Sequence, residues 1–301
     1  MMNRKKIVVV SGASGFIGKH MLEALQLSGI FVIAITRNVL RNDDSNLSDV
    51  KWCDWEKVES LLAEYLIDST FIAVIHLATE YGRNLSSLVE VEDSNVVKPL
   101  KLLDLAVKYK ANAFINTDSF FSKKEFSYRY MQPYIITKKH FAAIGQYYSE
   151  LHDISFVNMR LEHVYGPGDG EGKFIPYILS QLIDGQLDIK CTSGMQVRDF
   201  VYVDDVVAAY LTVLEKINDI PSYVEYQVGT GYGVSLQDFL IHLQHLVPGS
   251  RGTFDFGALP QRENEIMYST ANNNDLVKLG WKPKFDFKLG IRKLLENTQL
   301  K

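Results

Sequence analysis

The sequence predicts an α/β protein with a doubly wound parallel sheet and a smaller C-terminal lobe. Three observations carry this prediction. Short β-branched runs alternate with amphipathic segments through the first half, a glycine-rich loop joins the first run to the first amphipathic segment, and glycine and proline cluster at YGPGDGEGKFIP, residues 165–176. Strands that alternate with helices of this length are typical of a parallel sheet covered on both faces.

The expected elements follow the hydrophobic pattern. Strands are expected at 7–10, 31–35, 71–77, 113–115 and 154–159, with a strand-like segment at 224–231. Ile17, Met21 and Leu25 recur every four residues, which predicts the first helix. A long helix is expected at about 134–152, and Ser235 with Asp238 resembles a capping box that opens another.

The glycine and proline cluster predicts a change of domain. We expect residues 1–165 to form the first domain, with segments near 198–231 returning to its sheet, and residues 166–301 to form most of the second lobe.

Composition and charge narrow the class of protein. A formal net charge of −4 gives no attraction to nucleic acid or to an anionic membrane. No apolar run approaches the roughly 20 residues that span a bilayer, and the run at 7–10 is too short for a signal peptide. Cys53 and Cys191 make no disulfide framework, and the histidines lack metal-ligand spacing. A cytoplasmic protein without metal, nucleic-acid or membrane partners is expected.

The glycine-rich loop SGASGFIG, residues 11–18, places Gly12, Gly15 and Gly18 between the first expected strand and helix. Glycine there permits a tight turn, lets backbone approach a pyrophosphate, and lets the helix pack closely on the strand. The amides at the helix start then face the anion. The loop predicts a Rossmann-type dinucleotide site to which Ser14, Phe16 and Ile17 also contribute. The alternative is a turn with a structural role only.

The segment after the second expected strand bears on the choice of dinucleotide. Proteins that bind the unphosphorylated cofactor place Asp or Glu there to hold the ribose hydroxyls. Here the residues are Thr36, Arg37 and Asn38. Because a guanidinium attracts a 2′-phosphate and stacks on adenine, the sequence favours NADPH/NADP+ with Arg37 as the clamp. A solvated surface arginine is the alternative.

A tyrosine and a lysine lie one turn apart in Tyr134-Ile-Ile-Thr-Lys138, on one face of the expected long helix. A lysine cation beside a phenol favours phenolate and lowers the tyrosine pKa from about 10. Tyr134 is therefore a candidate proton donor to a developing alkoxide. Such pairs are common on helix surfaces, so the indication depends on the glycine loop that accompanies it.

Several segments together resemble the extended short-chain dehydrogenase/reductase family over nearly the whole chain. They are SGASGFIG, IHLAT (75–79), Asn95, YIITK (134–138), RLEHVYGPGD (160–169) and RDFVYVDDV (198–206). Members act mostly on nucleotide-linked sugars as epimerases, dehydratases or reductases. The resemblance implies a homodimer formed through two helices of the first domain. It also implies further cofactor contacts from Asp54, Leu77, Ala78, Thr79, Asn95 and Lys138, with Lys138 on the nicotinamide ribose.

The resemblance also implies where the substrate binds. Arg198 and Arg262 match residues that clamp the substrate diphosphate, which suits the planar fork of arginine. Lys173, Phe174 and Ile175 match residues that line the base pocket. Relatives carry Asn before Val-Tyr-Gly-Pro, whereas this chain has Glu162-His163. His163 either contacts the sugar or diphosphate or serves as a hydrogen-bonded supporting group.

NTDSFF, residues 116–121, follows the strand expected at 113–115. In the family this strand ends in a Ser or Thr that hydrogen-bonds the reacting sugar oxygen, and dehydratases carry Thr-Asp-Glu there. An ungapped match makes Thr117 the catalytic hydroxyl and Asp118 an accessory acid, with Ser119 at the dehydratase base. A serine is no strong base at neutral pH, so the motif favours reduction over elimination. A shifted match makes Ser119 the catalytic hydroxyl, and a Thr-Asp pair that caps a loop is the third alternative.

HLATEYG, NTDSFF and VNMRLEHVYGPGDGEGKFIPYI resemble nucleotide-sugar 4-ketoreductases of bacterial O-antigen (lipopolysaccharide) pathways. The resemblance implies NADPH-dependent reduction of the C4 ketone of a CDP-linked sugar, CDP-4-dehydro-3,6-dideoxy-D-glucose. Thr117 and Tyr134 would hydrogen-bond the ketone oxygen, and Tyr134 would deliver the proton. The alternatives are a reductase of opposite C4 stereochemistry, a nucleotide-sugar 4-epimerase that keeps its cofactor, and a non-catalytic NADPH sensor.

Overall fold

The computed structural model describes residues 5–39, 47–82, 87–126 and 130–298. The chain divides into two compact units. Met1–Ser122, Met131–Arg160 and Val207–Tyr226 form the first unit. Lys123–Tyr130, Leu161–Val206 and Gln227–Lys301 form the second.

The first unit is built on a seven-stranded sheet with the order β11-β6-β5-β4-β1-β2-β3. Its strands are β1 Lys5–Ser11, β2 Phe31–Ile35, β3 Val50–Cys53, β4 Ser69–His76, β5 Ala113–Ser119, β6 Ser155–Leu161 and β11 Tyr223–Val228. β1 pairs in parallel with both β2 and β4, and the strand order reverses at this point. The predicted doubly wound α/β fold is therefore confirmed.

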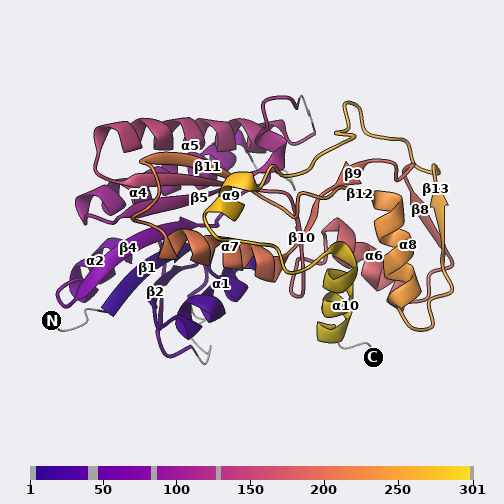
Figure 1. The fold of residues 1–301 in the computed structure, drawn as a ribbon, viewed down its shortest axis with the longest axis horizontal. Helices are drawn as coiled ribbons and strands as arrows, with labels where there is room; N and C mark the ends of the chain where they lie inside the picture. The colour runs from indigo at the N-terminus through magenta and orange to yellow at the C-terminus, as the bar shows by residue number, and fades with distance from the viewer. Residues whose placement is uncertain (1–4, 40–46, 83–86, 127–129, 299–301) are drawn as a thin grey trace. The chain divides into compact units, whose positions relative to one another are not determined.

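Helices cover both faces of this sheet. In Figure 1, α4 (Lys98–Lys108) and α5 (Gln132–Leu151) lie above it, and α1 (Phe16–Leu27) and α7 (Val203–Glu215) lie below. α2 (Val58–Tyr65) shares the apolar cluster of the α4 and α5 face. The centre of that cluster is aromatic, with Phe114 stacked on Phe156 at 5.6 Å and Phe141 edge-on to both.

The long helix was predicted to within two residues, and its Pro133 lies in the first turn, where a missing amide costs nothing. In the seven-stranded sheet, two strands differ most from expectation. β3 was not expected, and β5 continues through Asn116 and Asp118 to Ser119, beyond the expected end at 115. These polar residues fit a buried strand because Asn158 of β6 donates to Asp118 and accepts from Asn116.

An irregular helical segment follows β4. α3 (Leu88–Glu92) begins with a capping box from Ser87 and Glu90, and it runs into a π-helix, η1 (Asp93–Val97), which continues as α4. π-helical turns are rare and often lie at functional sites.

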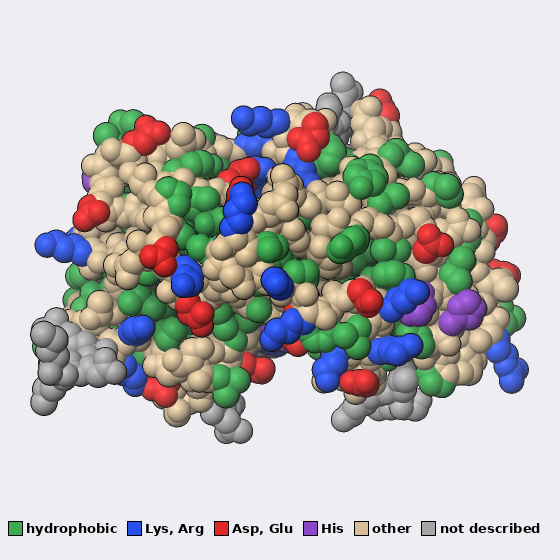
Figure 2. Space-filling view, viewed as in Figure 1, with side chains coloured by type: hydrophobic (Ala, Val, Ile, Leu, Met, Phe, Trp, Pro, Cys, Tyr) green, Lys and Arg blue, Asp and Glu red, His purple; other side chains and the backbone are tan. Residues whose placement is uncertain are grey.

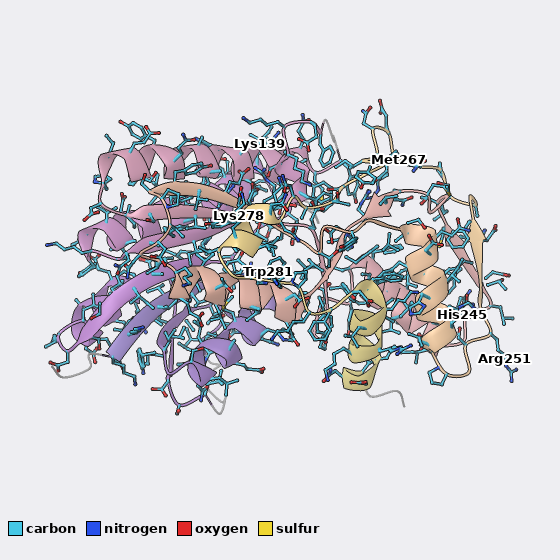
Figure 3. The ribbon with its side chains drawn as sticks, in the orientation of Figure 1. Lys139, His245, Arg251, Met267, Lys278 and Trp281 are labelled. Carbon is cyan, nitrogen blue, oxygen red and sulfur yellow. The ribbon has the colours of Figure 1, made fainter. Side chains whose placement is uncertain are left out.

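The second unit contains short strands and helices around an aromatic core. Its elements are β7 His163–Tyr165, α6 Phe174–Ile183, β8 Asp188–Cys191, β9 Val197–Arg198, β10 Phe200–Tyr202, β12 Val234–Ser235, α8 Leu236–Leu246, β13 Thr253–Phe256, α9 Asn274–Lys278 and α10 Phe287–Asn297. Phe200 stacks on Phe239 at 4.0 Å, and Tyr165 packs edge-on to both rings. Trp281, labelled in Figure 3, is buried and donates to the Asp205 carbonyl.

On the face drawn in Figure 2, Lys and Arg side chains are interspersed with Asp and Glu side chains. No helix in the described part of the chain has the length and apolar character needed to cross a bilayer.

Gly145 allows α5 to pack against β6, because a Cβ at this position would overlap the Phe156 ring. That ring is fully buried among other aromatic rings and cannot swing aside. We expect the overlap in Gly145→Ala to cost about 2 kcal/mol of stability. This cost exceeds the gain of about 1 kcal/mol that alanine brings in helix propensity, so the variant should be less stable. Thermal unfolding measures the change. Gly172→Ala is the control, since no heavy atom lies near a Cβ there. Equal midpoints for the two variants would contradict this packing.

Candidate active site

The glycine loop joins β1 to α1 in the first unit, where it was predicted. Gly12 has a φ of 71°, and a Cβ on it would overlap the backbone of Ala78. A Cβ on Gly18 would overlap the Gly12 carbonyl. Gly15 is the N-cap of α1, so the first amides of the helix have no intrahelical acceptor. Such close backbone approach beside a helix N-terminus fits the pyrophosphate of a dinucleotide.

The loop contacts the end of β2. Ser14 Oγ lies 3.0 Å from Thr36 Oγ1, which also accepts a 3.3 Å hydrogen bond from the Asn38 amide. Arg37 lies next to this bond and is exposed. Asp54, after β3, accepts hydrogen bonds from the amides of Glu56 and Lys57 and so caps the turn that leads into α2. Its carboxylate thus has a structural role in addition to the predicted cofactor contact.

Asn95, one of the expected cofactor residues, lies in the π-helix η1. It is buried in the π-helix, and its side-chain oxygen accepts from the Glu80 amide at 2.8 Å and from Thr79 Oγ1 at 3.3 Å. Its amide nitrogen donates to the Glu80 carbonyl at 2.8 Å and to Thr137 Oγ1 at 2.9 Å. The side chain therefore ties the loop after β4 to the turn of α5 that carries Lys138.

His76 is the last residue of β4, directly before the loop that follows this strand. Its Nδ1 is 2.6 Å from Ser11 Oγ, and burial lowers its pKa well below the usual value. Leu77 donates from its amide to the Ser11 carbonyl at 3.0 Å. The neutral imidazole therefore joins β4 to β1 directly below the glycine loop.

The predicted tyrosine and lysine lie together on α5. Lys138 Nζ is 5.8 Å from the centre of the Tyr134 ring and donates to the Thr117 carbonyl at 2.8 Å. Burial lowers the pKa of Lys138 to about 8, while the Asp118 carboxylate acts in the opposite direction. The unfolded chain binds the lysine proton more tightly, so the free energy of unfolding rises with pH between about 8 and the ordinary lysine pKa of 10.5.

Tyr81 stands beside the tyrosine and lysine pair. Its ring lies 5.1 Å from that of Tyr134, tilted by 32°. The residue follows β4 in HLATEYG and was not predicted as a site residue, because no spacing rule relates the loop to α5.

Asp118 lies inside the sheet. It is 2% exposed and accepts from the Ser119 amide, Ser122 Oγ, Asn158 Nδ2 and Arg160 Nε. Arg160 in turn forms a bidentate pair with Glu225 of β11, both distances being 2.5 Å. The Asp118 carboxylate already accepts hydrogen bonds from these four donors, one of them the Arg160 guanidinium, which argues against the accessory-acid role predicted for Asp118.

The two candidate hydroxyls differ in exposure. Thr117 is half-buried, and its Oγ1 lies 2.7 Å from the hydroxyl of Tyr210 on α7. Ser119 is buried, and its Oγ accepts a 3.4 Å hydrogen bond from the Phe121 amide. Within β5, all of whose residues are described, Thr117 is the one side chain that is not buried. This difference favours Thr117 over Ser119 as the group that meets a ligand.

The residues expected to bind substrate lie in the second unit, where most of them are already paired. Arg198 donates to Glu265 at 2.6 Å and is 7% exposed. The guanidinium of Arg262 lies 4.0 Å from the centre of the Tyr130 ring. Lys173 pairs with Asp169 at 2.9 Å. Arg198, Arg262 and Lys173 supply the positive charge that a diphosphate requires. A diphosphate would have to compete with Glu265 for Arg198.

Glu162-His163 replaces the Asn that relatives carry before Val-Tyr-Gly-Pro, and the structure gives Glu162 a structural role. Glu162 is buried and accepts from Lys123 Nζ at 2.5 Å and from Ser269 Oγ at 2.8 Å. Lys123 also donates to the Thr270 carbonyl at 2.7 Å. His163 packs edge-on to Phe200, and burial together with Arg198 and Lys173 lowers its pKa to about 4. A neutral His163 can donate one hydrogen bond and accept another.

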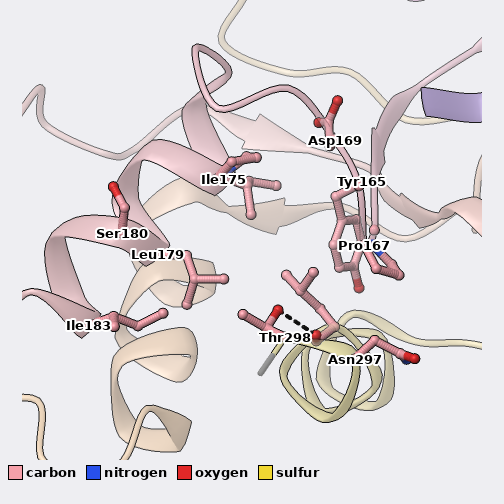
Figure 4. A pocket seen from close by; sticks show the side chains of 13 residues that line it. Tyr165, Pro167, Asp169, Ile175, Leu179, Ser180, Ile183, Asn297 and Thr298 are labelled. Atoms are coloured by element: carbon pink, nitrogen blue, oxygen red, sulfur yellow. Dashed lines mark hydrogen bonds between the residues drawn. The ribbon is translucent and has the colours of Figure 1, made fainter. Parts of the chain in front are cut away.

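Ile175 faces a pocket of ≈ 330 Å³ between α6 and α10, close to Tyr165 and Leu179 (Figure 4). Phe174, its neighbour, is 37% exposed and does not line this pocket. Among the described residues, no cluster of three or more His, Cys, Asp and Glu side chains is arranged to hold a metal ion.

Comparison with known proteins places these features in a wider group. Residues 8–229 match the model of the NAD dependent epimerase/dehydratase family. The chain is 63% identical to CDP-abequose synthase of Salmonella typhimurium strain LT2 over 293 residues, which covers 97% of this chain and 98% of that protein. It is 36% identical to CDP-abequose synthase of Salmonella muenchen, with coverage of 98% and 99%.

Solved structures share the fold. UDP-glucose 4-epimerase of Thermotoga maritima with UDP-glucose superimposes with a TM-score of 0.78 at 22% identity, covering 97% of this chain and 98% of that one. UDP-glucuronic acid 4-epimerase of Bacillus cereus, in complex with UDP-glucuronic acid and NAD, gives a TM-score of 0.80 at 21% identity with the same coverage.

The pKa of Lys138 provides a test of its expected contact with the dinucleotide. The ammonium loses its proton as the pH rises through about 8, and a neutral amine binds an anionic ligand more weakly. We expect the affinity for NADPH, measured by fluorescence titration, to fall roughly threefold to tenfold across about one unit on either side of this pKa.

Lys138→Met should remove this pH dependence. Lys139→Met should retain it, because Lys139 is an exposed neighbour on α5 (Figure 3). A pH-independent affinity in the unaltered protein would contradict the assigned contact.

Proposed function

The chain belongs to the NAD dependent epimerase/dehydratase family, and from this premise we propose that it makes CDP-abequose by reducing the C4 ketone of CDP-4-dehydro-3,6-dideoxy-D-glucose with NADPH. It is an oxidoreductase that acts on a nucleotide-linked sugar. The observation that carries the proposal is 63% identity to a CDP-abequose synthase over nearly the full length of both chains. CDP-abequose would serve O-antigen biosynthesis.

The residues on α5 and β5 suit carbonyl reduction. NADPH, when bound, supplies the hydride for C4. Tyr134 hydrogen-bonds the ketone oxygen and gives it a proton as charge develops there. Lys138, buried next to the Tyr134 ring, stabilises the phenolate that remains and holds the ribose. Thr117 donates a second hydrogen bond to the same oxygen.

Elimination of water, the reaction of the related dehydratases, would need an acid and a base at Asp118 and Ser119. Asp118 is buried inside the sheet, where its carboxylate already accepts from four donors. Ser119 is buried and has no basic group. The site therefore retains the groups for proton transfer to a ketone and lacks those for dehydration, which supports a reductase.

The proposed activity is tested by incubating the protein with CDP-4-dehydro-3,6-dideoxy-D-glucose and NADPH. We expect stoichiometric NADPH oxidation and, by NMR, an axial C4 hydroxyl in the product. Tyr134→Phe should lower kcat at least about a hundredfold, since it removes the proton donor, while the Kd for NADPH stays nearly unchanged.

An equatorial hydroxyl would instead identify a reductase of opposite stereochemistry. Turnover of a sugar nucleotide without net NADPH oxidation would identify an epimerase. Full activity of Tyr134→Phe would contradict the assigned proton donor.

The preference for NADPH over NADH is proposed from Arg37. It is exposed directly after β2, where a carboxylate would otherwise hold the ribose hydroxyls. We expect Arg37→Ala to raise the KM for NADPH about tenfold or more, because a charge-assisted phosphate contact is lost, and to leave the KM for NADH nearly unchanged. Lys139→Ala removes an equal charge elsewhere and should change neither. Equal losses for both cofactors in Arg37→Ala would refute the assignment.

A further inference from the structure

The hydroxyl pair of Thr117 and Tyr210 lies inside the first unit. Thr117 is near the end of β5 and Tyr210 is on α7, and their oxygens are 2.7 Å apart. Tyr210 is completely buried, whereas Thr117 is half-buried. The phenol thus lies on the interior side of the bond and the threonine on the accessible side.

The hydrogens available on the two hydroxyl groups determine which of them donates. Each group carries one hydrogen. Among the described residues, Thr117 is the only hydrogen-bond partner of the Tyr210 hydroxyl. If Thr117 donated, the phenolic hydrogen would be buried without an acceptor, at a cost of about 1–3 kcal/mol. Tyr210 is therefore the donor. Burial also raises the pKa of Tyr210 well above its ordinary value, so the phenol keeps its proton.

The consequence concerns the hydrogen of Thr117. Its oxygen accepts from Tyr210, so its own hydrogen is left for an acceptor on the accessible side. The backbone of Thr117 is held as well, because Lys138 Nζ donates to its carbonyl at 2.8 Å. Accepting one hydrogen bond also makes a hydroxyl a better donor of the next.

We propose that Tyr210 is a positioning residue: it donates to Thr117 Oγ1 and thereby directs the Thr117 hydroxyl hydrogen at the ketone oxygen of the nucleotide-linked sugar. The inference rests on the proposed reductase function. It also assigns the catalytic hydroxyl to Thr117, because the buried Ser119 hydroxyl has, within the described part of the chain, only a 3.4 Å contact with the Phe121 amide.

A double-mutant cycle tests this role with Tyr210→Phe, Thr117→Val and the double variant. Valine keeps the branched shape of threonine without its hydroxyl. We expect Tyr210→Phe to lower kcat about fivefold to twentyfold, as the Thr117 hydroxyl becomes free to rotate, with the Kd for NADPH unchanged. Thr117→Val should lower kcat further. The double variant should match Thr117→Val, because the phenol acts only through that hydroxyl.

Tyr148→Phe is the matched control. The Tyr148 hydroxyl, on α5, donates to Asp104 at 2.8 Å and has no contact with Thr117, so this substitution should leave kcat unchanged. An unchanged kcat in Tyr210→Phe would overturn the inference. The inference would also be overturned if Tyr210→Phe lowered kcat by the same factor in the unaltered protein and in Thr117→Val. Absence of turnover by the unaltered protein would count against the proposed function instead.

The denaturation midpoints of the same variants test the hydrogen bond without any assay of activity. The shifts should be less than additive, because either substitution removes the bond. Additive shifts would overturn the inference even if the enzyme were inactive toward the chosen sugar.

Discussion

One buried ammonium group organises the candidate active site. Lys138 Nζ bonds the Thr117 carbonyl and so fixes α5 against the end of β5. Because it is nearly inaccessible, this lysine has lost most of its hydration, and its pKa falls to about 8. Because Tyr134 is on the same helix as Lys138, this contact also places Tyr134 at the edge of the sheet where Thr117 lies. The chemistry proposed for the protein depends on this single contact between helix and strand.

A second set of interactions, within the sheet, holds the end of β5 that Lys138 contacts. Asn116, Asp118 and Asn158 continue as a polar ladder into Arg160 and Glu225, across β5, β6 and β11. Apart from Asn116 Oδ1, which has no hydrogen-bond partner among the described residues, the side-chain polar atoms of this ladder are paired, and this pairing offsets much of the cost of burying them. The dehydratase-like acid position is thereby converted into a structural element. The strand end stays rigid while only Thr117 presents a partly accessible side chain.

The parts of the fold and site that sequence predicted are those with local signals. The glycine loop, the tyrosine and lysine one turn apart, and the long α5 helix depend on residues close together in the chain. β5 extended beyond its apolar run because its polar residues find partners about 40 positions away on β6. Tyr210 is 93 residues from Thr117 and lies in an ordinary apolar helix pattern. No periodicity or motif distinguishes such a residue from a core tyrosine.

The π-helical turn that carries Asn95 has a consequence for how this region tolerates change in length. α3, η1 and α4 follow one another without a break, and the π-turn accommodates one residue more than an α-turn would. Loss of a single residue there would restore α-helical geometry and narrow the turn, which would move Asn95 while the flanking helices kept nearly their present register. Asn95 could then no longer reach both Glu80 and Thr137. Substitutions are easily absorbed on the exposed side of these helices, whereas a one-residue deletion would uncouple the loop after β4 from the turn that bears Lys138.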